Sequence, residues 1–160
     1  LLGAVTNRTG VPYDIARMYV GTVHSLCQRL LLDRRFHPDR DRGHAPALLD
    51  ELDQYLWLSA ARRWRELLAV AGFDPEDEAG ANAYLNGWFE GKAAGSMSKH
   101  VAVTNCIALF NRLSEECVDP DAACVRTDDE TLARLLRAYA HYRRALATDG
   151  VAPQTDFSLL

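Results

Sequence analysis

Residues 18–31 constrain the fold of this chain more than any other segment. Residues 18–20 (Met-Tyr-Val) are β-formers, and they end at the break Gly21-Thr22. Beyond the break, apolar residues recur at the spacing of one helical face. These residues are Val23, Leu26, Cys27, Leu30 and Leu31. The pattern predicts a strand that runs directly into a helix, with Thr22 as the N-cap.

A helix that begins at such a corner can bind an anion. Its first backbone amides have no partner within the helix, and the helix dipole places a partial positive charge there. Thr22, His24 and Ser25 add polar side chains at the same corner. The corner therefore suits a phosphate group. An ordinary strand-to-helix turn that binds no ligand has the same local features, so these residues alone leave both interpretations open.

The rest of the chain predicts a mainly α fold. Four further helices are expected, each after a capping residue or a capping sequence. Their expected starts are Asp50, Asp74-Pro75, Ser98 and Thr127-Asp128-Asp129-Glu130. The first of the four is expected to run to Gly72 and to bury one apolar face. That face comprises Leu52, Leu56, Ala60, Trp64, Leu67, Leu68 and Ala71.

Two segments are expected to depart from regular helix. Gly80, Gly87, Gly91 and Gly95 lower helix propensity, so this region is expected to be the most mobile part of the chain. Near the end of the chain, residues 151–153 (Val-Ala-Pro) are expected to stop the last of the four helices. Asp156 is then expected to cap a new helix.

Three segments, in the same order along the chain, resemble a known family. Gly21-Thr22-Val23-His24-Ser25 resembles a "GTFHS" segment, and residues 48–54 (LLDELDQ) are similar to "ILDEEDQ". Residues 139–142 (YAHY), followed by residues 155–160 (TDFSLL), resemble "YxxY…DFxxLL". All three segments occur in UvrD/Rep/PcrA-type superfamily 1 DNA helicases. Val23 and Ser158 depart from the family pattern, which suggests a divergent branch.

The resemblance implies a division of the chain and a set of partners. Residues 1–35 would be the edge of a RecA-like α/β motor domain, residues 36–153 an inserted helical subdomain (1B), and residues 154–160 the start of a helix returning to the motor domain. The implied partners are single-stranded or duplex-junction DNA and the remainder of the motor. The implied location is the cytoplasm. Thr22, His24 and Ser25 would meet a DNA phosphate, with Arg29 or Lys92 supplying outlying positive charge.

The motifs that bind nucleotide in such a motor do not occur in this sequence. A phosphate loop requires G-x-x-x-x-G-K-[ST]. The nearest segment, residues 87–93 (GWFEGKA), has three residues between its glycines and Ala93 in place of the hydroxyl residue. Lys92 is therefore interpreted as a solvated or DNA-facing base. The chain is expected to be a piece of a larger motor that uses ATP and Mg²⁺, to hold no cofactor itself, and to be inactive alone.

Two alternatives remain open. The same segments could belong to a helicase-nuclease, whose additional nuclease domain would lie outside this sequence. A free-standing helical protein-interaction module is the other alternative, and it would present a contiguous apolar groove. Such a module would not explain the strand-to-helix corner at residues 18–25.

Charge and cysteine content limit the remaining possibilities. Residues 1–44 carry seven arginines and four aspartates, whereas residues 45–160 carry eleven basic and eighteen acidic side chains. Any DNA contact is therefore expected to be local and weak. The four cysteines are spaced too widely for a typical metal site and are interpreted as buried apolar groups. No apolar run is long enough to cross a bilayer, so a membrane role is not expected.

Overall fold

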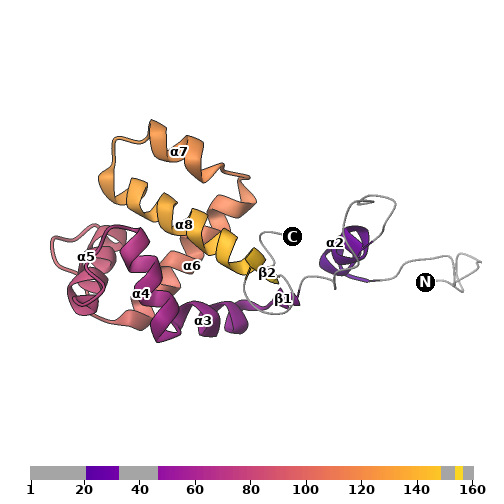
Figure 1. Cartoon of the computed structure of the whole chain (residues 1–160), viewed down its shortest axis with the longest axis horizontal. Helices are drawn as coiled ribbons and strands as arrows, with labels where there is room; N and C mark the ends of the chain where they lie inside the picture. Colours follow the sequence, from indigo (N-terminus) through magenta and orange to yellow (C-terminus); the bar gives the residue numbers. More distant parts are fainter. Residues whose placement is uncertain (1–20, 33–46, 149–153, 157–160) are drawn as a thin grey trace, which may run out of the picture. The chain divides into compact units, whose positions relative to one another are not determined.

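The computed structural model describes residues 21–32, 47–148 and 154–156. The chain divides into two compact units, residues 1–41 and residues 42–160. In the first unit the described element is helix α2 (Val23–Leu32), so the predicted helix after Thr22 is confirmed. The strand predicted at residues 18–20 lies outside the described residues. The second unit is mainly helical, as predicted, and is shown in Figure 1.

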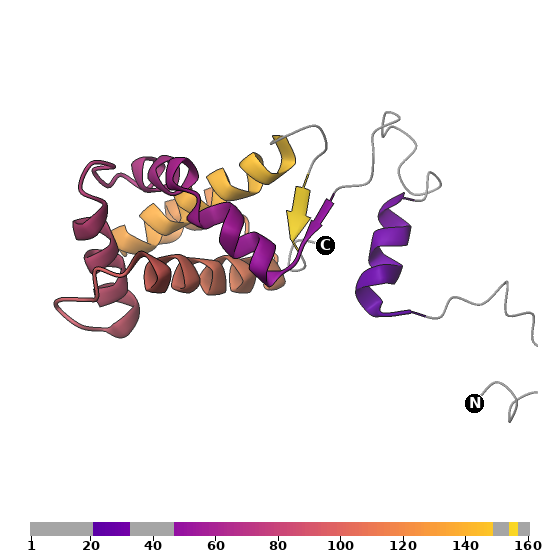
Figure 2. The ribbon, with the colours of Figure 1, turned by 90° about the horizontal axis from the view of Figure 1, so that it is seen from below.

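Two short strands join the ends of the described part of the second unit. Strand β1 (Ala47–Leu49) pairs in parallel with β2 (Gln154–Asp156), with Leu48 opposite Thr155. Figure 2 shows the two arrows side by side where the chain enters and leaves the helical body. Residues 154–156 are thus a strand, and assigning them to the start of a helix was wrong. Their ladder partner lies more than a hundred residues away in the sequence, so no local pattern reveals it. The helix expected after Asp156 lies outside the described residues.

The long helix predicted after Asp50 is two helices. Helix α3 (Glu51–Ser59) begins at Asp50, whose carboxylate accepts the backbone N–H of Asp53 at 2.8 Å. Helix α4 (Ala61–Val70) follows an extended residue, Ala60, with ψ of 130°. This break changes which side of α3 faces the core. Leu52 and Leu56 are consequently 63% and 56% exposed. The prediction that Leu52, Leu56 and Ala60 are buried was therefore wrong, whereas Trp64, Leu67, Leu68 and Ala71 are buried as predicted.

Helix α5 (Glu78–Glu90) forms despite two internal glycines. Its N-cap is Asp77, which accepts the N–H of Gly80 at 2.9 Å, so the expected start at Asp74-Pro75 was three residues early. The carboxylate of Asp74 instead accepts the N–H of Glu76 in the preceding turn. Gly91 ends the helix in the left-handed conformation, with φ of 65°. Left-handed backbone favours glycine at a helix C-terminus.

The loop after α5 folds back onto that helix. A Cβ atom on Gly95 would clash with the backbone nitrogen of Gly87 and the carbonyl oxygen of Ala83. Two buried side chains of α5 hold the same loop. Asn86 Nδ2 donates to the carbonyl oxygens of Ser96 and Ser98, and Asn82 Nδ2 donates to that of Met97. Gly87 and Gly95, which lower helix propensity, thus permit a close contact between two backbone segments.

Three helices complete the second unit: α6 (Lys99–Glu115), α7 (Pro120–Arg126) and α8 (Glu130–Thr148). Ser98 caps α6 as predicted. Helix α7 was not predicted, although Asp119-Pro120 carries the usual signal of an N-cap followed by proline. The N-cap of α8 is Asp129, which accepts the N–H groups of Thr131 and Leu132, and Thr127 lies before the cap.

The core lies between α3, α4, α5, α6 and α8. Its largest fully buried side chains are Trp64, Phe110, Tyr139 and Tyr142. A polar contact also crosses this core. Gln54 Nε2 of α3 donates at 2.9 Å to Asn111 Oδ1 of α6 and to the Tyr142 hydroxyl of α8. Because a buried amide needs partners, this contact fixes how the three helices meet.

Candidate nucleic-acid interface

The start of α2 has the hydrogen bonds of a capped helix. The backbone N–H of Ser25 donates to Thr22 Oγ1 at 3.2 Å, and Ser25 Oγ donates to the Thr22 carbonyl oxygen at 2.8 Å. The N–H of Leu26 also donates to that carbonyl, at 3.1 Å. The prediction of Thr22 as N-cap is therefore confirmed. The Thr22 hydroxyl accepts a helix amide, so the groups best placed to meet a phosphate are the earlier amides of the first turn.

Three of the predicted site residues follow one another along one side of α2. Thr22, Ser25 and Arg29 are separated by three and four residues, which is the spacing of neighbours on a helix surface. Thr22 and Arg29 are exposed, and Ser25 is half-buried. Seven residues of helix span about 10 Å, so Arg29 lies about two turns from the capped end. This side of α2 can contact an extended anion at two points.

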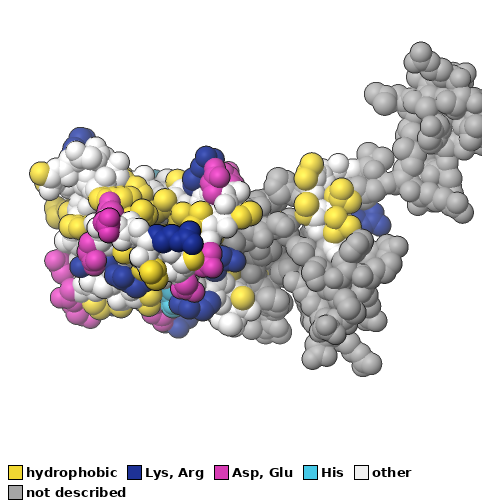
Figure 3. All heavy atoms as spheres, turned by 90° about the horizontal axis from the view of Figure 1, so that it is seen from above, with side chains coloured by type: hydrophobic (Ala, Val, Ile, Leu, Met, Phe, Trp, Pro, Cys, Tyr) yellow, Lys and Arg dark blue, Asp and Glu magenta, His cyan; other side chains and the backbone are white. Residues whose placement is uncertain are grey.

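The adjacent side of α2 is apolar and exposed. Val23, Leu26 and Leu30 are 74%, 41% and 44% exposed, and Figure 3 shows hydrophobic side chains gathered on this helix. Cys27, which belongs to the same predicted apolar face, is half-buried. The predicted helical periodicity is thus present in α2. Val23, Leu26 and Leu30 remain accessible, whereas the side chain of Leu31, which also belongs to the predicted face, lies outside the described residues.

Two further predicted site residues are His24 and Lys92. The backbone of His24 lies in the first turn of α2, and its side chain lies outside what the structure describes. Lys92 belongs to the second unit. Its ammonium group lies 3.2 Å from the carboxylate of Glu90, and its side chain is 68% exposed.

The surroundings of Lys92 differ from those of a phosphate loop. In a phosphate loop the lysine precedes a helix, whose amides point toward the bound anion. Lys92 instead follows the C-terminus of α5, and its N–H donates to the Gly87 carbonyl oxygen at 2.8 Å. A helix C-terminus carries partial negative charge and attracts a cation. This geometry agrees with the interpretation of Lys92 as a solvated base.

The four cysteines were interpreted from the sequence as buried apolar groups. All four are free, but they differ in burial, so the prediction that all are buried holds for Cys106 alone. Cys117 is exposed, and Cys27 and Cys124 are half-buried. Among the described residues, no group of His, Cys, Asp and Glu side chains is arranged to hold a metal ion.

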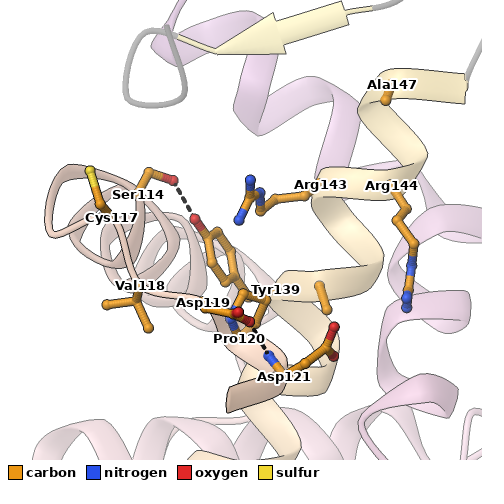
Figure 4. Close-up of a pocket in the computed structure, with 11 residues that line it drawn as sticks. Ser114, Cys117, Val118, Asp119, Pro120, Asp121, Tyr139, Arg143, Arg144 and Ala147 are labelled. Atoms are coloured by element: carbon orange, nitrogen blue, oxygen red, sulfur yellow. Dashed lines mark hydrogen bonds between the residues drawn. The ribbon is translucent and has the colours of Figure 1, made fainter. Parts of the chain in front are cut away.

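A groove that the sequence did not predict lies where α6 ends and α7 packs on α8. Its volume is about 840 Å³. Figure 4 shows Tyr139 and Arg143 of α8 in this groove, with the Tyr139 hydroxyl 2.8 Å from Ser114 Oγ. The Arg143 guanidinium lies 5.6 Å from the centre of the Tyr139 ring. Arg143 and Arg144 form no ion pair within the described ranges.

Comparisons with known proteins gave no assignment. No family model, no curated protein and no solved structure matches this chain. Across residues 21–32, 47–148 and 154–156, no helix has the length and apolar character that crossing a membrane requires.

Proposed function

We propose that this chain is part of an ATP-dependent DNA helicase of the UvrD/Rep/PcrA type, in which the helical unit guides DNA beside the motor. The proposed DNA contact is the start of α2, where the amides after Thr22 meet a backbone phosphate. Ser25 and His24 assist at the same corner, and Arg29 supplies charge two turns further on. Lys92 contributes less, because Glu90 neutralises it.

The pairing of β1 with β2 is the observation that supports this proposal best. An inserted domain leaves its host and returns to it at neighbouring points. The two ends of the described helical unit meet in this way, with Ala47 opposite Gln154 and Leu49 opposite Asp156. A parallel pair of three-residue strands is also far smaller than a sheet that is stable by itself. Both properties agree with a helical insertion that continues into a larger α/β domain.

The capped start of α2 supports the proposed contact. A helix N-terminus offers amide donors and a favourable dipole to an anion. The Thr22 side chain fixes the position of this end through its bond with Ser25. Arg29 on the same side of the helix adds a guanidinium group, which forms paired hydrogen bonds with phosphate.

Binding of a fluorescently labelled single-stranded oligonucleotide, followed by anisotropy over a series of salt concentrations, tests the proposal. Thr22→Asp retains a good N-cap residue but places a negative charge where the phosphate would bind. We expect unchanged helical content by circular dichroism and an affinity at least about tenfold lower. Arg29→Ala should lower the affinity for the oligonucleotide. It should also make the logarithm of the affinity fall less steeply with the logarithm of the salt concentration, and this salt slope should decrease by about one unit.

Arg62→Ala is the matched control for Arg29→Ala. Arg62 is an exposed arginine on α4, in the second unit, that pairs with Glu66 at 3.1 Å, so its loss removes the same charge from a different element. Its replacement should leave the salt slope unchanged. Equal losses of oligonucleotide affinity in the two variants would indicate diffuse electrostatic attraction and contradict the proposed contact at α2. The absence of any binding at low salt would contradict DNA guidance by this chain.

The exposed apolar side of α2 favours one second candidate, a protein-interaction module. Val23, Leu26 and Leu30 form a stripe of the kind that enters a hydrophobic groove. Under this alternative, replacing Leu26 and Leu30 by Ser would abolish partner binding and leave oligonucleotide binding unchanged.

A further inference from the structure

One side of helix α7 carries two charged and two small apolar residues. They are Asp121, Ala122, Val125 and Arg126, which fall within an arc of about 140° on the helix surface. Ala122 is half-buried, and the other three are exposed. Val125 is 88% exposed, the highest value among the exposed large hydrophobic residues of the described chain. Covering this side chain with a partner would remove its apolar area from water, which is favourable.

The charges on this side of α7 are ordered along the helix. Asp121 lies in the first turn and Arg126 in the last, and neither forms an ion pair within the described residues. By contrast, the neighbouring Arg134 and Arg137 on α8 both contact Glu130. A helix that is acidic at one end and basic at the other is complementary to an antiparallel copy of itself. Antiparallel pairing also opposes the two helix dipoles favourably.

The residue register supports the same arrangement. A two-fold axis through the middle of α7 places Asp121 opposite Arg126 of a second copy, and Ala122 opposite Val125. The small Ala122 side chain then leaves space for the Val125 side chain of the other copy. An interface with this reciprocity is isologous, which is the commonest type in dimers.

The surface on both sides of α7 is hollowed. Beside Asp121 lies the groove of about 840 Å³ that contains Arg143 and Tyr139. Beside Ala122 and Arg126 lies a second hollow of about 490 Å³. Figure 3, seen from the α7 side of the second unit, shows hydrophobic, acidic and basic side chains mixed on this face. The ridge formed by α7 is thus flanked by hollows that can receive side chains of an opposing ridge.

We propose that α7 is a self-association surface, through which two copies of this chain pair with their α7 helices antiparallel. The paired ridge is short, because seven helical residues span about 10 Å. The interface therefore belongs to the small, weak class, and we expect a dissociation constant of about 100 µM. This association does not depend on the proposed DNA contact.

Sedimentation velocity over a range of protein concentrations, under reducing conditions because Cys117 is exposed, measures this association. Asp121→Arg and Arg126→Asp should each weaken self-association at least about tenfold, because each creates two like-charge contacts across the two-fold axis. Neither residue is the N-cap of α7, which is Asp119, so both variants should fold. Circular dichroism and thermal unfolding verify this directly.

Mixing the two variants is the decisive measurement. In a mixed dimer, each reversed charge meets a residue of opposite sign, so association should return to the wild-type level. Met97→Ser, which removes another exposed apolar side chain outside α7, should have no effect. A wild-type chain that stays monomeric at millimolar concentration would overturn the proposal. Dimers that persist in either single variant, or an equimolar mixture that stays monomeric, would also overturn it.

Discussion

At the scale of single residues, burial has its clearest chemical effect at Cys106. This thiol lies in the core on α6, and its burial raises its pKa from 9.0 to about 12. Because burial disfavours the thiolate, the folded protein binds this proton more tightly than the unfolded chain does. The resulting stabilisation is complete below pH 9 and is lost as the pH rises toward 12.

We predict a measurable pH dependence from this one group. Between about pH 8 and about pH 10, the free energy of unfolding should fall by about 1 kcal/mol through Cys106. Cys106→Ala should lack this component. Urea unfolding at several pH values measures it, with Val103→Ala as a control for truncating a buried residue of the same helix. Parallel pH profiles for wild type and Cys106→Ala would contradict the prediction.

At the scale of elements, the connection from α5 to α6 departs most from expectation. From helix propensity alone, residues 80–95 were expected to be the most mobile part of the chain. In the structure, the glycines at positions 87 and 95 let two backbone segments touch, and Asn82 and Asn86 bind the loop carbonyls. A residue without a side chain is costly in a helix but necessary where backbones meet. We therefore expect this loop to be well ordered.

Gly95→Ala tests the close contact. The added Cβ would meet the Gly87 nitrogen and the Ala83 carbonyl oxygen, which belong to backbone and cannot rotate away. We expect a loss of about 3 kcal/mol in the free energy of unfolding, measured with urea. Gly91→Ala is the control, since a Cβ there meets nothing within 4 Å and only the φ of 65° is strained. It should cost about 1 kcal/mol. A larger loss from Gly91→Ala than from Gly95→Ala would show that the contact is unimportant.

At the scale of the whole molecule, the described core belongs to one unit. Its members run from Leu49 to Leu146, and all of them lie within residues 42–160. The buried contact among Gln54, Asn111 and Tyr142 lies within the same range. A unit with its own core and its own polar contacts is expected to fold independently.

Residues 42–160 produced alone should therefore unfold cooperatively. We expect a Tm within about 4 °C of the full chain, measured by circular dichroism at 222 nm, because the core remains complete. The matched comparison is a chain of residues 61–160, which lacks β1 and α3 and so loses Trp57 and Leu58 from the core. It should unfold at a much lower temperature. Equal unfolding of the two shortened chains would contradict this description of the core.

The sequence by itself determined the features whose hydrogen bonds are local. Thr22, Asp50 and Ser98 cap helices as predicted, because each bonds to an amide three residues away. The capped start of α2, the main part of the candidate site, could be predicted for the same reason.

The tertiary structure alone decided the features that depend on distant partners. β2 is a strand because β1 lies beside it, and no sequence pattern at residues 154–156 indicates that partner. The extended residue Ala60 rotates α3 relative to α4. As a result, Trp57 and Leu58 lie in the core, whereas Leu52 and Leu56 are exposed. Gly95 is required by a backbone segment that approaches it from α5. In each case the deciding contact joins residues whose proximity arises only when the helices pack.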